Sequence, residues 1–304
     1  MRKEKESPEE IELWNSIPKQ SKKDRGDTYF RLSLIAFEKA QYGNSLALAE
    51  NACDCFKENC DEVGLANAQT AVAFNLYEMK QTREAIRALV KAVLGYAKTE
   101  DDQEWQYREH LARWFKEVED FELARVQIQK IVDHCKETLD EYGTAYFQFL
   151  LGQASCDLDK CEQAIDEYKE SRQLYKNLKE PRDVAEVDLY MARCYNHLKN
   201  CLEAQTCATR AASVFELIED RVKTSQSYSQ LGRALNGQRE FERALSVYEK
   251  AHILIIEKLP INFHGLNLIL NGKSKALKGL GRTDEAELID RRNRVIAETL
   301  GIEA

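Results

Sequence analysis

The chain has 304 residues with only 13 glycines and 4 prolines, and 43% of its residues are hydrophobic and 32% charged, a composition that favours long helices and excludes a disordered chain. Its formal net charge of -8 argues against a general nucleic-acid binder, because binding to phosphates requires a basic face. No run of 18 apolar residues would span a bilayer, and the first ten residues lack the apolar core of a signal peptide, so we expect a cytoplasmic protein without a membrane or nucleic-acid partner.

Positions 1–20 are expected to form a separate N-terminal segment with a short capping helix. Ser7 is a preferred helix-capping residue, Pro8 suits the first helical position, and two acids follow in the first turn. We therefore predict a helix over residues 8–17. Its apolar side chains are expected to lie on the first repeat of the chain: Ile11, Trp14 and Ile17.

From position 21 to position 304 the sequence is built of regularly spaced repeats. Small residues recur at steps of 40, 39, 40, 40, 40 and 42 positions: Ser45, Ala85, Ala124, Ala164, Ala204, Ala244 and Ala286. A second small residue stands 12 positions before each of them: Ser33, Ala73, Ala112, Gly152, Ala192, Gly232 and Ser274. We divide the region into seven copies, at residues 21–60, 61–100, 101–140, 141–180, 181–220, 221–260 and 261–304.

Each copy predicts two helices. Both halves of a copy carry apolar residues at helical spacing, and short polar turns separate the halves. The small residues indicate where antiparallel helices cross closely. Gly152 and Gly232 indicate this most clearly, because a glycine inside a helix costs about 1 kcal/mol relative to alanine and needs a packing reason. One pair cannot bury its apolar face alone, so we expect the pairs to stack into an elongated superhelix.

The sixth copy resembles the tetratricopeptide repeat. It carries large and small residues at the spacing of that family: Tyr228, Leu231, Gly232, Leu235, Ala244, Tyr248 and Ala251. The period exceeds the family's usual length of about 34 residues, and is similar to that of the long-repeat members typified by kinesin light chains and by the Leu-Gly-Asn-repeat spindle-orientation proteins. The resemblance implies an all-α fold, a right-handed superhelical solenoid of seven helix-turn-helix repeats, in which the first helix of each pair lines the concave face.

The sequence contains no phosphate loop, nucleophile elbow or paired-histidine zinc helix, so we expect neither an enzyme nor a cofactor. The working surface is instead expected on the concave face that the resemblance implies. Carried over by repeat column, the residues predicted to bind a peptide are basic and amide side chains of the later copies and two aromatic side chains of the second copy: Arg113, Lys116, Gln153, Arg193, Asn196, Arg233, Asn236, Lys275, Phe74 and Tyr77.

An Arg and Asn pair recurs at the same place in two successive copies, as Arg193 with Asn196 and as Arg233 with Asn236. Residues three apart share a helix face, so two neighbouring helices would offer the same pair to one groove. The guanidinium supplies forked donors for a carboxylate, and the amide pairs with the backbone of an extended peptide. We therefore predict an extended ligand that is acidic or bears a carboxylate. The alternative is that these side chains only keep the helix face hydrated.

Aromatic residues gather on the same face of the first two copies: Phe30, Phe37, Phe74 and Tyr77. One interpretation is a pocket for a hydrophobic anchor of a partner. The other is a surface that the N-terminal segment covers through Trp14.

Nine cysteines scattered through the chain are expected to be reduced thiols. Two groups have ligand types that suit zinc: Cys194-x2-His197-x3-Cys201-x5-Cys207 and Cys53-x-Cys55-x4-Cys60. Neither group has the paired CxxC spacing of a structural zinc site. Cys161 and Cys201 also occupy the same column as Tyr42, Phe121 and Phe241, a packing position where a small buried hydrophobe suffices. We therefore predict no metal site.

The sequence thus predicts a non-catalytic interaction scaffold or adaptor that binds a protein or peptide ligand in its concave groove. Two alternatives stay open. The first is a peptide-sensing regulator resembling the bacterial quorum-sensing receptors built on tetratricopeptide repeats, although the segment before the repeats, positions 1–20, is too short for the effector domain that those receptors carry. The second is a structural subunit of an obligate assembly, such as a homodimer.

Overall fold

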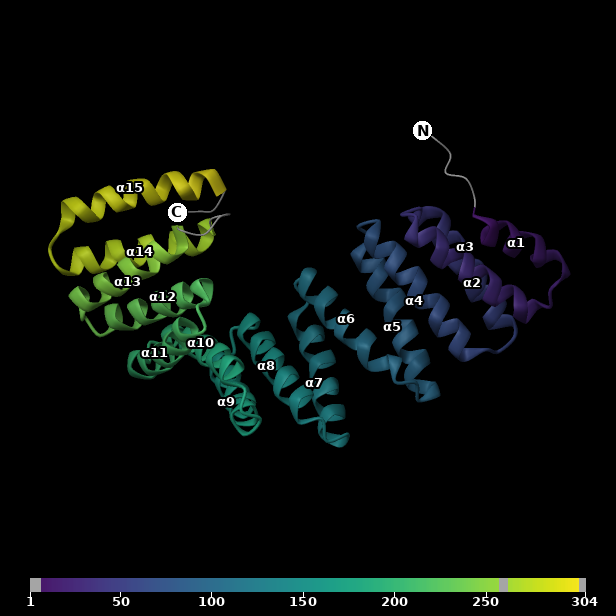
Figure 1. The fold of residues 1–304 in the computed structure, drawn as a ribbon, viewed down its shortest axis with the longest axis horizontal. Coiled ribbons are helices and arrows are strands. Elements are labelled where there is room, and N and C mark those ends of the chain that lie inside the picture. The colour runs from purple at the N-terminus through teal and green to yellow at the C-terminus, as the bar shows by residue number, and fades with distance from the viewer. Residues whose placement is uncertain (1–6, 257–261, 301–304) are drawn as a thin grey trace. The chain divides into compact units, whose positions relative to one another are not determined.

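The computed structural model describes residues 7–256 and 262–300, which form a succession of α-helices joined by short turns (Figure 1). No β-strand occurs in these residues. The chain folds into two compact units, Met1–Ile131 and Val132–Ala304. None of the helices in the described part is long and apolar enough to cross a membrane. The predicted all-α class is confirmed.

The N-terminal unit begins with a short helix and a 3₁₀ turn, and antiparallel helices follow. Its elements are α1 (Pro8–Ser16), η1 (Ile17–Lys19), α2 (Lys22–Glu38), α3 (Tyr42–Glu58), α4 (Glu62–Glu78), α5 (Thr82–Thr99), α6 (Gln103–Glu117) and α7 (Phe121–Glu137), the last of which continues into the second unit. Helices α2 with α3 and α4 with α5 form closely packed pairs, and the first helices α2 and α4 also contact each other.

The second unit continues the same arrangement. Its helices are α8 (Glu141–Asp157), α9 (Cys161–Asn177), α10 (Pro181–His197), α11 (Cys201–Leu217), α12 (Arg221–Gly237), α13 (Phe241–Ile256), α14 (Phe263–Gly279) and α15 (Thr283–Leu300). The first helices of successive pairs contact one another in the order α8, α10, α12, α14. From α2 to α15 the described residues contain seven helix pairs, which confirms the predicted helix pair per repeat.

The short helix α1 is present, and Ile17 just after it packs on the first repeat as predicted, whereas Ile11 and Trp14 do not. Leu13 is buried in a cluster with Leu32, Ala36 and Leu48, whereas Ile11 and Trp14 are 47% and 41% exposed. The N-terminal cap decides this rotation. Glu10 bonds back to the backbone of Ser7, and its carboxylate also pairs with Lys39 Nζ at 2.5 Å, which places the face of Glu10 and Leu13 against α2. Amphipathic spacing alone does not include this polar anchor, and it therefore placed Ile11 and Trp14 at the contact with the first repeat.

Most first helices of the repeats begin at a polar capping residue. Asp61, Asp140, Asp220 and Asn262 each accept a hydrogen bond from the backbone N–H three positions later. Such caps satisfy N–H groups that have no partner inside the helix. The capping residues therefore set where each repeat begins.

Nearly every helix ends at a residue with a left-handed backbone, and only one of these residues is glycine. The positive φ angles recur at nearly regular intervals along the chain: Ala40, Cys60, Lys80, Glu100, Glu119, Leu139, Asp159, Lys179, Lys199, Glu219, Arg239 and Gly281. This conformation lets the next N–H bond back into the last helical turn, as Gln41 N–H does to Ala36 O at 2.9 Å. A side chain at such a position costs about 1 kcal/mol that glycine avoids.

Replacing Leu139 by glycine is therefore expected to raise the free energy of unfolding by about 0.5–1 kcal/mol. Leu139 has φ +58° and its side chain is 85% exposed, so little packing is lost. Leu94→Gly is the matched control, because Leu94 is an exposed leucine inside α5, where glycine is expected to destabilise by about 1 kcal/mol. Urea unfolding followed by circular dichroism measures both changes, and two losses of equal size would contradict the prediction.

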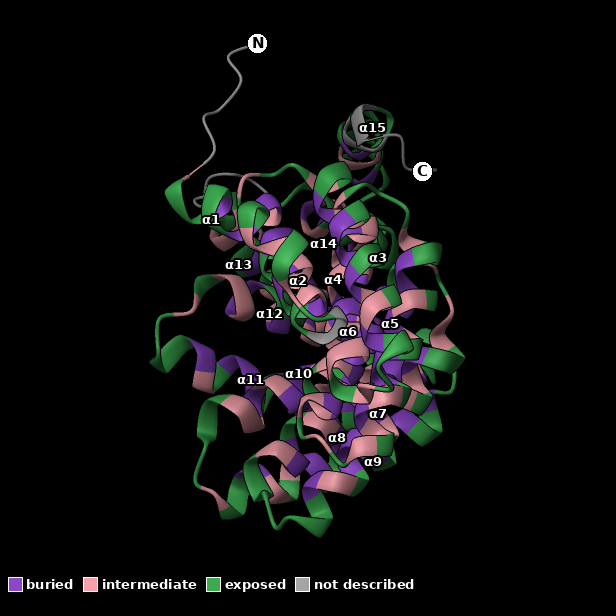
Figure 2. Cartoon of the chain, turned by 90° about the vertical axis from the view of Figure 1, so that its right-hand side faces the viewer, coloured by how far each residue is buried: buried purple, intermediate pink, exposed green. Residues whose placement is uncertain are grey.

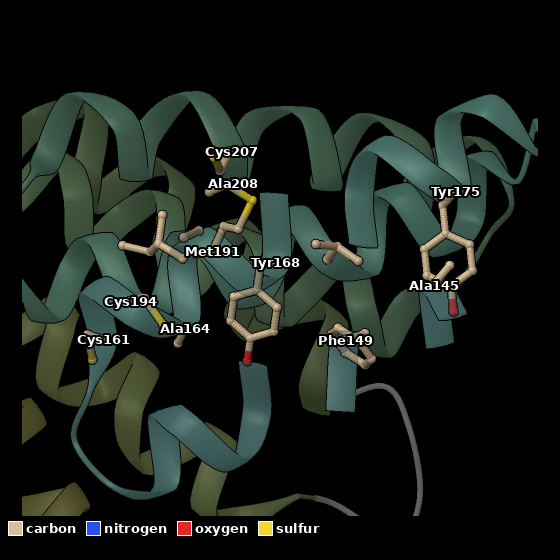
Figure 3. Packing of buried hydrophobic residues seen from close by; sticks show 13 residues of the cluster. Ala145, Phe149, Cys161, Ala164, Tyr168, Tyr175, Met191, Cys194, Cys207 and Ala208 are labelled. Carbon is tan, nitrogen blue, oxygen red and sulfur yellow. The ribbon is translucent and has the colours of Figure 1, made fainter. Parts of the chain in front are cut away.

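Buried residues occupy the helix faces that meet other helices, and buried and exposed residues alternate along each helix (Figure 2). In the second unit the core cluster draws on helices α8 to α11, with Tyr168 fully buried among Phe149, Ala164 and Met191 (Figure 3). A Cβ atom at Gly152 would stand 2.5 Å from the ring of Tyr168. At Gly232 it would stand 2.8 Å from the ring of Tyr248. Both glycines therefore have a packing reason, as the sequence predicts, and that reason is the space that a tyrosine ring of the paired helix occupies.

Candidate functional site

A groove of about 670 Å³ lies in the second unit, between first helices of neighbouring repeats. Residues of α10, α12 and α14 line it, together with the last turn of α13 and the turn that joins α8 to α9. The groove is lined by both apolar and polar side chains. Apolar side chains of Leu254, Leu268 and Ile269 lie among polar ones such as Gln226 and Ser229. Binding sites commonly combine an apolar surface with a few polar groups in this way.

Arg193 and Arg233 are the two predicted ligand-binding residues that the structure brings together in the groove. Both side chains are exposed, and neither has an ion pair with an acid within the described residues. The guanidinium of Arg193 lies 5.4 Å from the centre of the Tyr190 ring, and Lys223 Nζ lies 6.0 Å from the same ring. This cation–π contact holds Arg193 at the wall and leaves its N–H groups able to donate in the plane of the guanidinium.

Asn196 and Asn236 do not line the groove. Both side chains are buried, and the amide of Asn196 donates to the backbone carbonyl of Gln230 at 2.9 Å. The amide of Asn236 donates to the carbonyl of Gly272, also at 2.9 Å. Each asparagine thus joins its own first helix to the first helix of the next repeat, and the donors that the sequence reasoning assigned to a peptide are used inside the chain.

The remaining predicted residues lie elsewhere. Gln153 and Lys275 belong to the second unit but do not line the groove, whereas four residues belong to the N-terminal unit: Phe74, Tyr77, Arg113 and Lys116. There the ring of Tyr77 stacks on the buried Trp114 at 4.5 Å, and the ring of Phe74 meets it edge-on at 5.3 Å. Arg113 bonds to His110 Nδ1. The aromatic pair therefore packs against α6.

The surroundings of two residues in the N-terminal unit, Tyr77 and His110, shift their pKa values. The Tyr77 hydroxyl donates to Glu117 Oε1 at 2.7 Å, and this hydrogen bond raises the pKa of Tyr77. Burial, with a smaller contribution from the nearby Arg113 charge, lowers the pKa of His110. Both residues are therefore held in their neutral forms near neutral pH.

Three cysteine thiols converge at the end of the groove near the α8–α9 turn, and the sequence reasoning did not group them. The Sγ atoms of Cys156, Cys161 and Cys194 all lie within 4.8 Å of one another. The Sγ atoms of Cys156 and Cys194 are 2.8 Å apart, and this contact lowers the pKa of Cys156 to about 7 and raises that of Cys194. Cys161, in turn, also lies close to Asp159 and His197. The thiols come from two successive repeats, so proximity in the sequence does not indicate the group.

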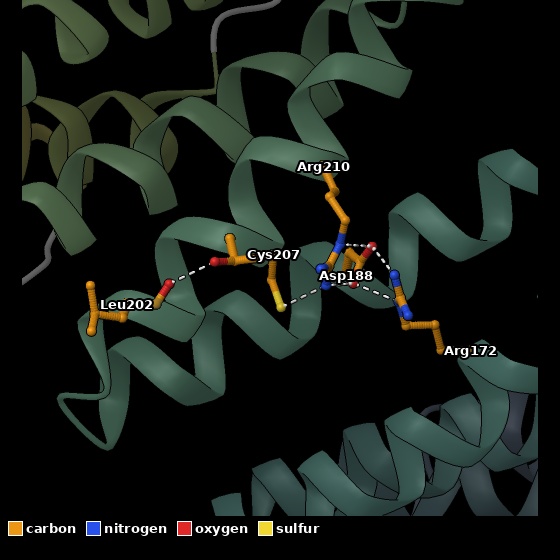
Figure 4. Close-up of polar contacts among 6 residues, drawn as sticks. Arg172, Asp188, Leu202, Cys207 and Arg210 are labelled. Atoms are coloured by element: carbon orange, nitrogen blue, oxygen red, sulfur yellow. Dashed lines mark hydrogen bonds and ion pairs between the residues drawn. The ribbon is translucent and has the colours of Figure 1, made fainter.

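A second feature that the sequence reasoning missed is a buried carboxylate held by two arginines. Asp188 of α10 is 1% exposed. Its oxygens accept from Arg172 of α9 and from Arg210 of α11, each with a shortest distance of 2.8 Å (Figure 4). The three side chains link one repeat to the next. In the sequence, Asp188 differs from its equivalents in the other repeats only in being an acid, because most of those positions hold aromatic, amide or aliphatic residues.

Residues 183–252, which contain α11, α12 and most of α10 and α13, match the family model of the tetratricopeptide repeat. Residues 183–252 carry tetratricopeptide repeats. Outside this match, the arrangement of helix pairs extends the same architecture through the described residues. No curated protein sequence matches the chain.

Several solved structures have the same fold at low sequence identity. A tetratricopeptide repeat protein from Parabacteroides merdae is 13% identical with a TM-score of 0.59, covering 90% of this chain and 93% of its own. The apo form of RapI is 14% identical with a TM-score of 0.57, covering 91% and 98%. Kinesin light chain repeats of Podosopora anserina are 16% identical with a TM-score of 0.55, covering 64% and 95%. At these identities the likeness shows the fold alone.

Proposed function

We propose that the chain is a non-catalytic interaction scaffold that binds an extended, acidic segment of a partner protein in the groove of the second unit. The observation that carries this proposal is the pair of exposed arginines, Arg193 and Arg233, which face one groove from equivalent places on α10 and α12 and have no acidic partner among the described residues. A scaffold role agrees with the tetratricopeptide repeats of residues 183–252.

The groove offers each kind of contact that such a segment needs. Arg193 and Arg233 supply forked donors for carboxylates. Gln226 and Ser229 line the groove from α12 and can pair with the ligand's backbone, in place of the asparagines that the chain itself uses. Leu268 is 49% exposed on the α14 side and provides an apolar contact for one side chain of the ligand. The proposed ligand is therefore an extended peptide with two acidic positions and an apolar residue.

The test compares two double variants of the second unit that change the net charge by the same amount. Arg193→Glu with Arg233→Glu places acids in the groove, whereas Arg182→Glu with Arg239→Glu changes two exposed arginines that do not line it. A library of fluorescent peptides with paired glutamates is titrated against each, and circular dichroism checks the helix content. We expect the groove variant to raise Kd at least tenfold, or about 1.4 kcal/mol, and the control to change it less than threefold.

Equal loss of binding in the two variants would show that only net charge matters. Absence of binding of any acidic peptide to the unmodified chain would also contradict the proposal. Because the contacts are charged, affinity is expected to fall as the salt concentration rises.

Peptide-sensing regulation is the second candidate, and the likeness to Rap proteins favours it. A Rap protein complexed with competence and sporulation factor is 16% identical with a TM-score of 0.50, covering 91% of this chain and 76% of its own. A regulator needs two states of different ligand affinity. We would therefore expect small-angle scattering to change when a groove-binding peptide is added, whereas a scaffold with a preformed groove is expected to scatter alike in both conditions.

A further inference from the structure

Three thiols from three helix ends meet beside the groove. Cys156 comes from the last turn of α8, Cys161 from the first position of α9, and Cys194 from the last turn of α10. Cys161 and Cys194 are buried, while Cys156 is half-buried and lines the groove. Cys201 occupies the same place in the next repeat as Cys161, but it belongs to no such group within the described residues. The packing role that Cys161 shares with Cys201 therefore does not explain why three thiols meet at Cys161.

A nitrogen donor and a carboxylate lie beside Cys161, the member that this group shares with the three thiols. His197 follows Cys194 by three positions, so both side chains leave the same face of α10. The ligand atoms of His197, Asp159 and Cys161 lie within 4.8 Å of one another. His197 Nε2 also stands 3.2 Å from Asp159 Oδ1. A carboxylate hydrogen-bonded to an imidazole is the arrangement that orients histidine ligands in metal sites.

We propose that Cys156, Cys161, Cys194 and His197 bind one zinc ion, with Asp159 orienting the imidazole. Three thiolates and one imidazole are a ligand set of structural zinc sites, which are tetrahedral with Zn–S distances of about 2.3 Å. That geometry places the sulfurs about 3.8 Å apart, within the 4.8 Å over which these thiols are grouped. The Cys156 and Cys194 sulfurs separate from 2.8 Å by side-chain rotation when the ion enters between them.

Binding replaces the three thiol protons, which pass to the solvent, and involves no change of oxidation state. Three thiolates around Zn²⁺ leave a net charge of about -1, which the positive charge of the neighbouring Arg193 offsets. The ion links the end of α8 and the start of α9 to the end of α10. It therefore fastens one repeat to the next at the rim of the groove, whether or not the groove binds a peptide.

The test uses the full-length chain, reduced and freed of metal, titrated with Zn²⁺ against a chromophoric chelator and with Co²⁺ for its absorption spectrum. We expect one ion per chain and, with Co²⁺, the charge-transfer and d–d bands of a tetrahedral thiolate site. Asp159→Asn removes a residue that only orients a ligand, and we expect it to weaken zinc binding 10–100-fold. Cys156→Ala and His197→Ala each remove a ligand, and we expect them to weaken zinc binding by more than about 100-fold. Cys201→Ala, the matched control, is expected to leave the affinity unchanged.

Several results would overturn the proposal. These are less than one ion per reduced chain, an affinity that Cys156→Ala and His197→Ala leave unchanged, or equal losses in Cys201→Ala. His197 is exposed and Cys156 half-buried, so both variants are expected to fold, and circular dichroism checks that they do. Failure of peptide binding in the groove leaves these outcomes unaffected, so the two proposals are tested separately.

Discussion

Replacing Asp188 by alanine is expected to lower the free energy of unfolding of the second unit by about 3 kcal/mol. The carboxylate is almost fully buried, and Arg172 and Arg210 both bond to it. Without it, two guanidinium groups face each other with no anion between them. Arg210 is 43% exposed and can turn toward water, but the side chain of Arg172 is only 18% exposed. The loss is therefore expected near the lower end of the range for broken buried ion pairs.

Asp166→Ala is the matched control, because Asp166 is an exposed acid of α9 with one ion pair, to Lys169 at 2.9 Å. Surface pairs of this kind contribute about 0–1 kcal/mol. Urea unfolding monitored by circular dichroism is the measurement. If the two variants lose similar stability, the Asp188 cluster does not hold the repeats together as the structure indicates.

Replacing Gly152 by leucine is expected to lower the free energy of unfolding by about 3 kcal/mol. The first added carbon alone would stand 2.5 Å from the fully buried ring of Tyr168, which neighbouring helices enclose. Helices α8 and α9 must move apart to accept the side chain. Their displacement opens contacts throughout the core cluster, and this outweighs the gain of about 1 kcal/mol from replacing a helical glycine.

Gly43→Leu is the control for helix propensity, because a Cβ atom there meets nothing within 4 Å and the residue is exposed in α3. This variant is expected to be neutral or slightly more stable. Combining Gly152→Leu with Tyr168→Ala tests the clash itself. The double variant is expected to lose less stability than the sum of the two single losses, because the smaller residue makes room. If the two single losses of stability add up in the double variant, the clash with Tyr168 is not the cause of the Gly152→Leu effect.

Much of the fold could be predicted because its signals are local or recur at one spacing. Gly152 and Gly232 indicated positions with a packing constraint, and the rings of Tyr168 and Tyr248 supply that constraint. The position of α1 was predicted, but its rotation was not. Leu13 and Trp14 point about 100° apart around the helix axis, and the bonds of Glu10 with Ser7 and Lys39 place Leu13 rather than Trp14 at the contact.

The candidate site was predicted only in part. Arg193 and Arg233 line the groove, whereas the asparagines three positions later are buried and bond to the next first helix. Comparison of equivalent repeat positions places both residues of an i, i+3 pair on one helix face, but the neighbouring helix covers one edge of that face. The helix that covers it determines whether a polar side chain meets a ligand or a neighbouring backbone carbonyl.

By itself the sequence determined the all-α class and the helix pair per repeat, because helical periodicity and caps act between neighbours in the chain, and the small residues recur at a nearly constant step. Only the tertiary structure decided which side chains meet across repeats. Cys156 and Cys194 are 38 residues apart, and Asp188 is joined to arginines 16 residues before it and 22 residues after it. These contacts depend on how far each helix is rotated and shifted against the next, and side-chain packing in the assembled core sets those values.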